Sequence, residues 1–150
     1  MRKEYKGLFP DITLKYKKGT IKKFKIRSSK DSESVLREIM NQDTLEIQEE
    51  FCVIFLNNNN NSIGWYRVST GGMTGTLVDV RLVLVTALQC GATSMILGHN
   101  HPSGQLKASK SDIIITKKLQ DAGKLLDIRV LDHLIITDES FLSLSDDNFL

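Results

Sequence analysis

Two histidines separated by one residue, with a carboxylate eleven positions further on, constrain this 150-residue chain more than any other feature. His99 and His101 follow an apolar run, residues 95–97, which predicts a buried strand. Because side chains alternate across a strand, both histidines would point to one side and Asn100 to the other. Pro102 cannot donate to a β-ladder and ends the strand. The pattern therefore predicts two imidazoles side by side at a strand end.

A helix is predicted to begin after the turn that follows this strand. Ser109 is a favoured N-cap residue, and Asp112 falls in the first turn, where a carboxylate also suits the helix dipole. The strand end would supply two nitrogen ligands and the helix start one oxygen ligand. Three protein ligands with a position open for water are typical of catalytic zinc. The same set also suits iron, so the metal's identity stays open.

The spacing of these residues resembles a known metal motif. Five residues at fixed offsets form the pattern His-x-His-Pro-x6-Ser-x-x-Asp: His99, His101, Pro102, Ser109 and Asp112. It is similar to the motif of the JAB/MPN (JAMM) metalloprotease superfamily, and the runs 99–104 and 130–136 look like its RadC-like branch. The resemblance covers residues 49 to 144. It implies an α/β fold, a three-layer, cytidine-deaminase-like sandwich in which helices flank a central mixed β-sheet.

The resemblance also implies an activity. RadC-like JAB domains would be zinc-dependent metallopeptidases, in which a metal-activated water attacks a peptide or isopeptide bond. The family places a glutamate general base before the first core strand, in a Glu-x-Phe pattern that Glu49 matches. Glu50 is the alternative, and adjacent strand residues face opposite sides, so only one of them can reach the metal water. The substrate itself is not evident.

Three polar residues near the motif have more than one interpretation. Ser109 stabilises an oxyanion in the family pattern, while as an N-cap it would stabilise the helix by about 1 kcal/mol. Asn100, on the side away from the metal, is expected to brace the strand against a loop. His133 lies in an apolar run, which favours a buried core residue, although it could also support a metal ligand.

Hydrophobic periodicity predicts the remaining elements and an α/β sandwich. They are a hairpin over residues 12–26, helices over 31–41, 79–90 and 109 to about 122 before Gly123, strands over 51–56, 63–68, 128–136 and 141–144, and an asparagine loop over 57–61. We divide the chain into an N-terminal extension, residues 1–43, made of a basic β-hairpin plus a short helix, and a RadC-like JAB/MPN domain, residues 44–150.

The charge distribution suggests a second class of function. Residues 1–30 contain eleven Lys/Arg and two Asp/Glu, whereas residues 31–150 contain nine and sixteen. A basic segment can attract nucleic acid, which leaves open a DNA-repair-associated binding protein or nuclease. The competing interpretation is a solvated, lysine-rich hairpin. A non-catalytic JAB-like scaffold is a third possibility, although such relatives usually lose a metal ligand.

Composition also bears on the compartment. No apolar run approaches the roughly 20 residues that a membrane-spanning helix needs, and no signal peptide is evident behind the charged N-terminus. Cys52 and Cys90 lie in apolar segments, as expected for reduced thiols. We therefore expect a cytoplasmic protein that does not contact a membrane.

Overall fold

The computed structural model describes residues 23–72 and 75–150. Most of the predicted hairpin over residues 12–26, and with it most of the basic segment over residues 1–30, lies outside the described residues. Among the helices that are described, none is long and apolar enough to cross a membrane.

A five-stranded mixed sheet forms the centre of the fold. Its strands are β1 (Glu50–Leu56), β2 (Ser62–Thr70), β3 (Ser94–Asn100), β4 (Arg129–Ile136) and β5 (Phe141–Ser143), in the order β2-β1-β3-β4-β5. β1 runs antiparallel to both β2 and β3, β3 and β4 are parallel, and β5 is antiparallel to β4. The carboxyl ends of β3 and β4 therefore meet at one edge of the sheet.

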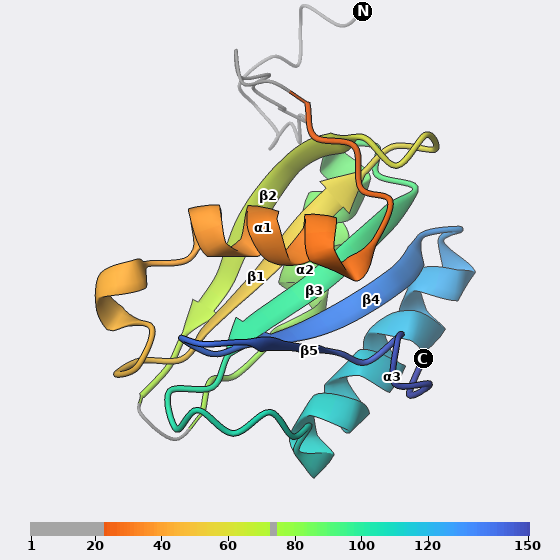
Figure 1. Cartoon of the computed structure of the whole chain (residues 1–150). Helices are drawn as coiled ribbons and strands as arrows, with labels where there is room; N and C mark the ends of the chain where they lie inside the picture. The colour runs from red at the N-terminus through yellow and green to blue at the C-terminus, as the bar shows by residue number, and fades with distance from the viewer. Residues whose placement is uncertain (1–22, 73–74) are drawn as a thin grey trace, which may run out of the picture.

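Helices cover both faces of this sheet. They are α1 (Ser29–Ile39), α2 (Val80–Gln89) and α3 (Lys110–Leu125), with a short 3-10 helix, η1, at Gln42–Thr44. In Figure 1, α1 crosses one face, and α2 and α3 lie behind the other. The predicted three-layer α/β architecture with a central mixed sheet is confirmed.

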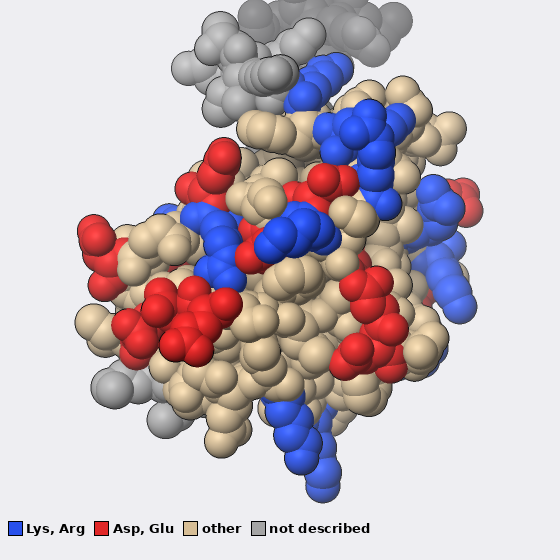
Figure 2. Space-filling model, viewed as in Figure 1, with Lys and Arg blue, Asp and Glu red and all other residues tan. Residues whose placement is uncertain are grey.

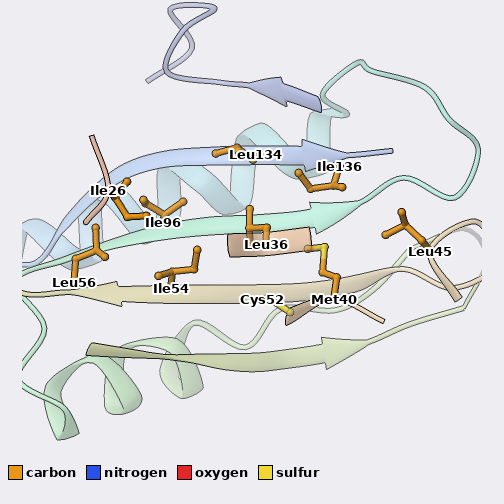
Figure 3. Packing of buried hydrophobic residues seen from close by; sticks show 10 residues of the cluster. All are labelled: Ile26, Leu36, Met40, Leu45, Cys52, Ile54, Leu56, Ile96, Leu134 and Ile136. Atoms are coloured by element: carbon orange, nitrogen blue, oxygen red, sulfur yellow. The ribbon is translucent and has the colours of Figure 1, made fainter. Parts of the chain in front are cut away.

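The period-two alternation of β1 explains why the sheet can be covered on both sides. All seven of its residues are buried. Cys52, Ile54 and Leu56 face α1, where Leu36 and Met40 pack among them (Figure 3). The intervening residues belong to a second apolar cluster with α2 and α3. A strand buried on both faces reads as a continuous apolar run, which is the pattern found in the sequence.

The helix boundaries follow from their caps. At α1, Ser28 accepts a hydrogen bond from the Asp31 backbone N–H, and the Asp31 side chain accepts one from the Ser28 backbone. This capping box starts α1 at Ser29, two residues before the predicted start. Asp79 caps α2, and Gly91 follows its C-cap with a left-handed φ of 69°, which is usual for a glycine that closes a helix.

The predicted end of α3 before Gly123 is wrong. The helix continues to Leu125, and Gly123 is a buried position within it. A Cβ at this position would lie 2.3 Å from the carbonyl oxygen of Ile128, the residue directly before β4. The glycine is therefore explained by the close approach of another backbone segment, and not by a helix end.

The predicted asparagine loop joins β1 to β2, which pair as an antiparallel hairpin. The backbone N–H of Asn57 donates to the Asn61 carbonyl (3.0 Å), and Asn60 takes a left-handed φ of 54°. The domain boundary between residues 43 and 44 remains a prediction. Leu36 and Met40, on the N-terminal side of it, belong to the same core as the strands.

We expect Gly123→Ala to destabilise the fold by about 1–3 kcal/mol, because the new methyl group overpacks against a backbone oxygen. Urea unfolding would measure the change. Gly64→Ala is the matched control, since a Cβ there meets no atom within 4 Å. Equal unfolding free energies in the two variants would contradict the packing explanation.

Candidate metal centre

The two histidines are held at the carboxyl end of β3 by strands on both sides. His99 pairs with Phe51 of β1 and with Ile135 of β4. The backbone N–H of His101 continues the ladder by donating to the Ile136 carbonyl (2.9 Å). His99 is almost fully buried and His101 partly so. The predicted side-by-side placement of the imidazoles follows, with their Nε2 atoms 2.9 Å apart.

The carboxylate comes from the first turn of α3. Ser109 is the N-cap, and its hydroxyl accepts from the Asp112 backbone N–H (3.1 Å). Asp112 Oδ2 in turn accepts from the Ser109 backbone N–H (2.6 Å). This reciprocal pair fixes both the helix start and the direction of the Asp112 side chain.

His99, His101 and Asp112 together form a group that could hold a metal ion, with all ligand atoms within 4.8 Å of one another. Asp112 Oδ1 lies 3.2 Å from His99 Nε2, and Asp112 Oδ2 lies 3.5 Å from His101 Nε2. Tetrahedral coordination with bonds of about 2.0–2.1 Å would place ligand atoms about 3.3 Å apart. The three residues therefore fit a zinc-sized ion.

Each imidazole is oriented by a hydrogen bond on its other nitrogen. His101 Nδ1 lies 2.8 Å from the Gln105 carbonyl oxygen, to which it donates. His99 Nδ1 lies 2.8 Å from His133 Nε2. Such partners on the far side of the ring are usual for metal-ligating histidines. No sequence pattern indicates Gln105, because the contact uses its backbone carbonyl and not its side chain.

Electrostatics within the cluster favour an ionised carboxylate. Burial acts to raise the pKa of Asp112, but the adjacent imidazoles of His101 and His99 outweigh it and hold the pKa well below its usual range. The pKa of His101 is raised, chiefly by its hydrogen bond with Asp112, against the opposing effect of burial. His133, which is fully buried, has a pKa well below its ordinary value because of that burial. A deprotonated carboxylate is the form that binds a metal.

The two adjacent glutamates lie on opposite sides, as the alternation requires. Glu50 is buried; its Oε2 accepts from Arg67 Nε (2.7 Å) and its Oε1 from the Asn41 backbone N–H (2.9 Å). Glu49 is half-buried and interacts electrostatically with the three candidate ligands. Burial is the main cause of its raised pKa. Its catalytic role remains a prediction.

Asn100 connects β3 to the loop that precedes β1, as predicted for a brace. Its Nδ2 group donates to the carbonyl oxygens of Leu45 (2.7 Å) and Gln48 (2.8 Å). Its Oδ1 accepts from the Glu50 backbone N–H (2.7 Å). The residue between the two histidines therefore holds both sides of the chain that carries Glu49.

Comparison with known proteins assigns the chain to a family. The RadC-like JAB domain model matches residues 26–149, and the chain belongs to this family. A UPF0758 protein of Flavobacterium johnsoniae is 49% identical over 123 residues, covering 82% of this chain and 52% of the relative. Others are found in Methanosarcina mazei (38% identical, 85% of this chain and 55% of the relative) and Haemophilus influenzae (40% identical, 80% and 54%). The chain thus spans about half the length of the curated relatives it matches.

The geometry of the candidate metal centre does not bear on the predicted role of the basic N-terminal segment. Residues 1–22 lie outside the described part, so a nucleic-acid contact through residues 1–30 remains a prediction. On the molecular face that Figure 2 shows, lysine and arginine side chains alternate with acidic groups and do not form one continuous basic surface.

We expect Asn100→Ala to lower the free energy of unfolding by about 1–3 kcal/mol, because it leaves buried backbone groups without hydrogen-bond partners. Chemical denaturation would measure the loss. Asn58→Ala, at an exposed turn position, is the matched control and should unfold like the unmodified chain. A neutral effect of Asn100→Ala would show that water replaces its hydrogen bonds.

Proposed function

We propose that this chain is a zinc-dependent metallopeptidase of the RadC-like JAB type, which hydrolyses a peptide or isopeptide bond. The convergence of His99, His101 and Asp112 on one point carries the proposal. The substrate would be a peptide or protein whose identity is unassigned.

The donor set suits a catalytic metal. Two imidazole nitrogens and one carboxylate oxygen leave a fourth position for water or substrate. When bound, zinc would supply Lewis acidity, lowering the pKa of a water molecule to near 7 and polarising a carbonyl group. Iron can use the same ligands, so metal analysis has to decide between them.

Glu49 is the proposed general base. Glu49 is half-buried, and its carboxyl group interacts electrostatically with the three candidate ligands. Burial raises the pKa of this carboxyl group. A carboxylate with a raised pKa accepts a proton more readily, which is what a base must do when water attacks a carbonyl. Glu50 is unsuited to this role, because Arg67 and a backbone N–H already occupy its two oxygens.

Ser109 is proposed to stabilise the developing oxyanion. In the capping box its hydroxyl oxygen accepts a hydrogen bond from the Asp112 backbone. The hydroxyl hydrogen can still be donated, so the N-cap role and the oxyanion role are compatible. The exposed position of Ser109 leaves it accessible to a substrate.

We expect about one zinc per chain in the purified protein and much less in Asp112→Ala, because the variant loses the only anionic ligand of the set. Elemental mass spectrometry after dialysis would measure the content. Asp121→Ala removes an exposed carboxylate from the same helix and should retain zinc. Equal zinc in all three proteins would exclude this site, and another metal in place of zinc would correct the assignment.

We expect Glu49→Gln to keep zinc but lower hydrolysis by about 10²–10⁴-fold, the usual contribution of a general base. A mixture of internally quenched fluorescent peptides serves as the probe. The control is Glu46→Gln, an exposed neighbour in the same segment. Hydrolysis that survives in Glu49→Gln would contradict its role. Zinc binding without any hydrolysis would favour the scaffold alternative.

A further inference from the structure

His133 is a buried imidazole that the proposed mechanism does not use. It lies on β4 and pairs with Leu97 of β3. Leu97 precedes His99 by two residues on the same strand. Side chains two positions apart on a strand share a face, so His133 and His99 point to the same side of the sheet. The side chain of His133 is fully buried.

A chain of hydrogen bonds runs from the strand ligand to the helix ligand through this residue. His99 Nδ1 lies 2.8 Å from His133 Nε2. On the other side of the ring, His133 Nδ1 lies 2.6 Å from Thr116 Oγ1. Thr116 Oγ1 is also 2.6 Å from the backbone carbonyl oxygen of Asp112.

The direction of each hydrogen bond in this chain follows from the one between Thr116 and the Asp112 carbonyl oxygen. A carbonyl oxygen can only accept, so the Thr116 hydroxyl donates its single hydrogen to Asp112. The hydroxyl oxygen must then accept from His133 Nδ1–H. A neutral imidazole carries one N–H, which leaves His133 Nε2 as an acceptor for His99 Nδ1–H.

We propose that His133 and Thr116 are positioning residues that fix His99 in its Nδ1–H tautomer, so that its Nε2 presents a lone pair to the metal. This inference rests on the proposed metal site. It adds to that proposal the pair of residues that selects the binding-competent form of one ligand.

The comparison with His101 shows why Thr116 is needed. The partner of His101 is a carbonyl oxygen of Gln105, which can only accept and thereby fixes the tautomer by itself. The partner of His99 is another imidazole, which can either donate or accept. The direction of the hydrogen bond between His99 and His133 is determined only because Thr116 accepts from His133 Nδ1.

The surroundings shield the contact between the two imidazoles from water. The Phe51 ring stacks on His99, with centroids 5.9 Å apart, and makes a T-shaped contact with His133, with centroids 5.4 Å apart. Phe51 is itself buried.

Histidine side-chain NMR of the ¹⁵N-labelled, metal-free protein tests the inference directly. Long-range ¹H–¹⁵N spectra at mildly alkaline pH distinguish protonated from bare ring nitrogens. We expect Nδ1–H and bare Nε2 on both His99 and His133. A proton on Nε2 of His99, with bare Nδ1, would overturn the proposal.

Two variants of Thr116 supply the matched comparison. Thr116→Val keeps the shape but removes the acceptor, whereas Thr116→Ser keeps the hydroxyl. We expect zinc, titrated against a competing chelator, to bind about 10–100-fold more weakly to Thr116→Val. Thr116→Ser should bind like the unmodified chain and restore its NMR pattern. Circular dichroism of each variant confirms that the comparison is made on folded protein.

The outcomes separate this inference from the proposed function. Strong zinc binding to the unmodified chain, with the same affinity and His99 tautomer in Thr116→Val, would overturn the positioning role and leave the metal site intact. If the unmodified chain binds no zinc, the proposed function fails, while the tautomers of the metal-free protein still decide whether His133 and Thr116 direct the His99 ring.

Discussion

The alternation of side chains at the carboxyl end of β3 is the constraint on which the rest of the site depends. His99 points toward α2 and α3, whereas Asn100 points toward the α1 face and holds the loop before β1. β1 and β4 pair with β3 on both sides, so neither direction can change without breaking the ladder. A single strand end therefore places a candidate ligand and braces the segment that carries Glu49.

Gathering two imidazoles and a carboxylate at one partly buried point has an energetic consequence. Desolvation disfavours the charge on Asp112, and the adjacent imidazoles together with the hydrogen bond from the Ser109 backbone compensate for it. The arrangement is preformed in the metal-free fold, since the caps and ladders hold it in place. An ion that binds this folded site and not the unfolded chain would stabilise the protein by mass action.

The parts of the structure that depend on local patterns could be predicted from the sequence. Strand alternation placed both histidines on one side, and the N-cap signal placed Asp112 in the first turn of a helix. Contacts between segments distant in sequence could not be predicted. The local rule that a glycine ends a helix misplaces the end of α3. Gly123 lies within the helix, where it is required by the close approach of the Ile128 backbone. The contact between His133 and His99 depends on the register between β3 and β4, and the contact between His133 and Thr116 depends on how α3 packs against β4. No local pattern encodes either one.

The burial of Cys52 makes this thiol a reporter of motion in the α1 layer. It lies between the sheet and α1 with no exposed surface, and burial, together with the nearby Glu50 carboxylate, raises its pKa to about 12. A thiol in this state reacts with an alkylating reagent only when the layer above it opens. The alkylation rate of Cys52 thus measures how often α1 separates from the sheet, on the face opposite the candidate metal centre.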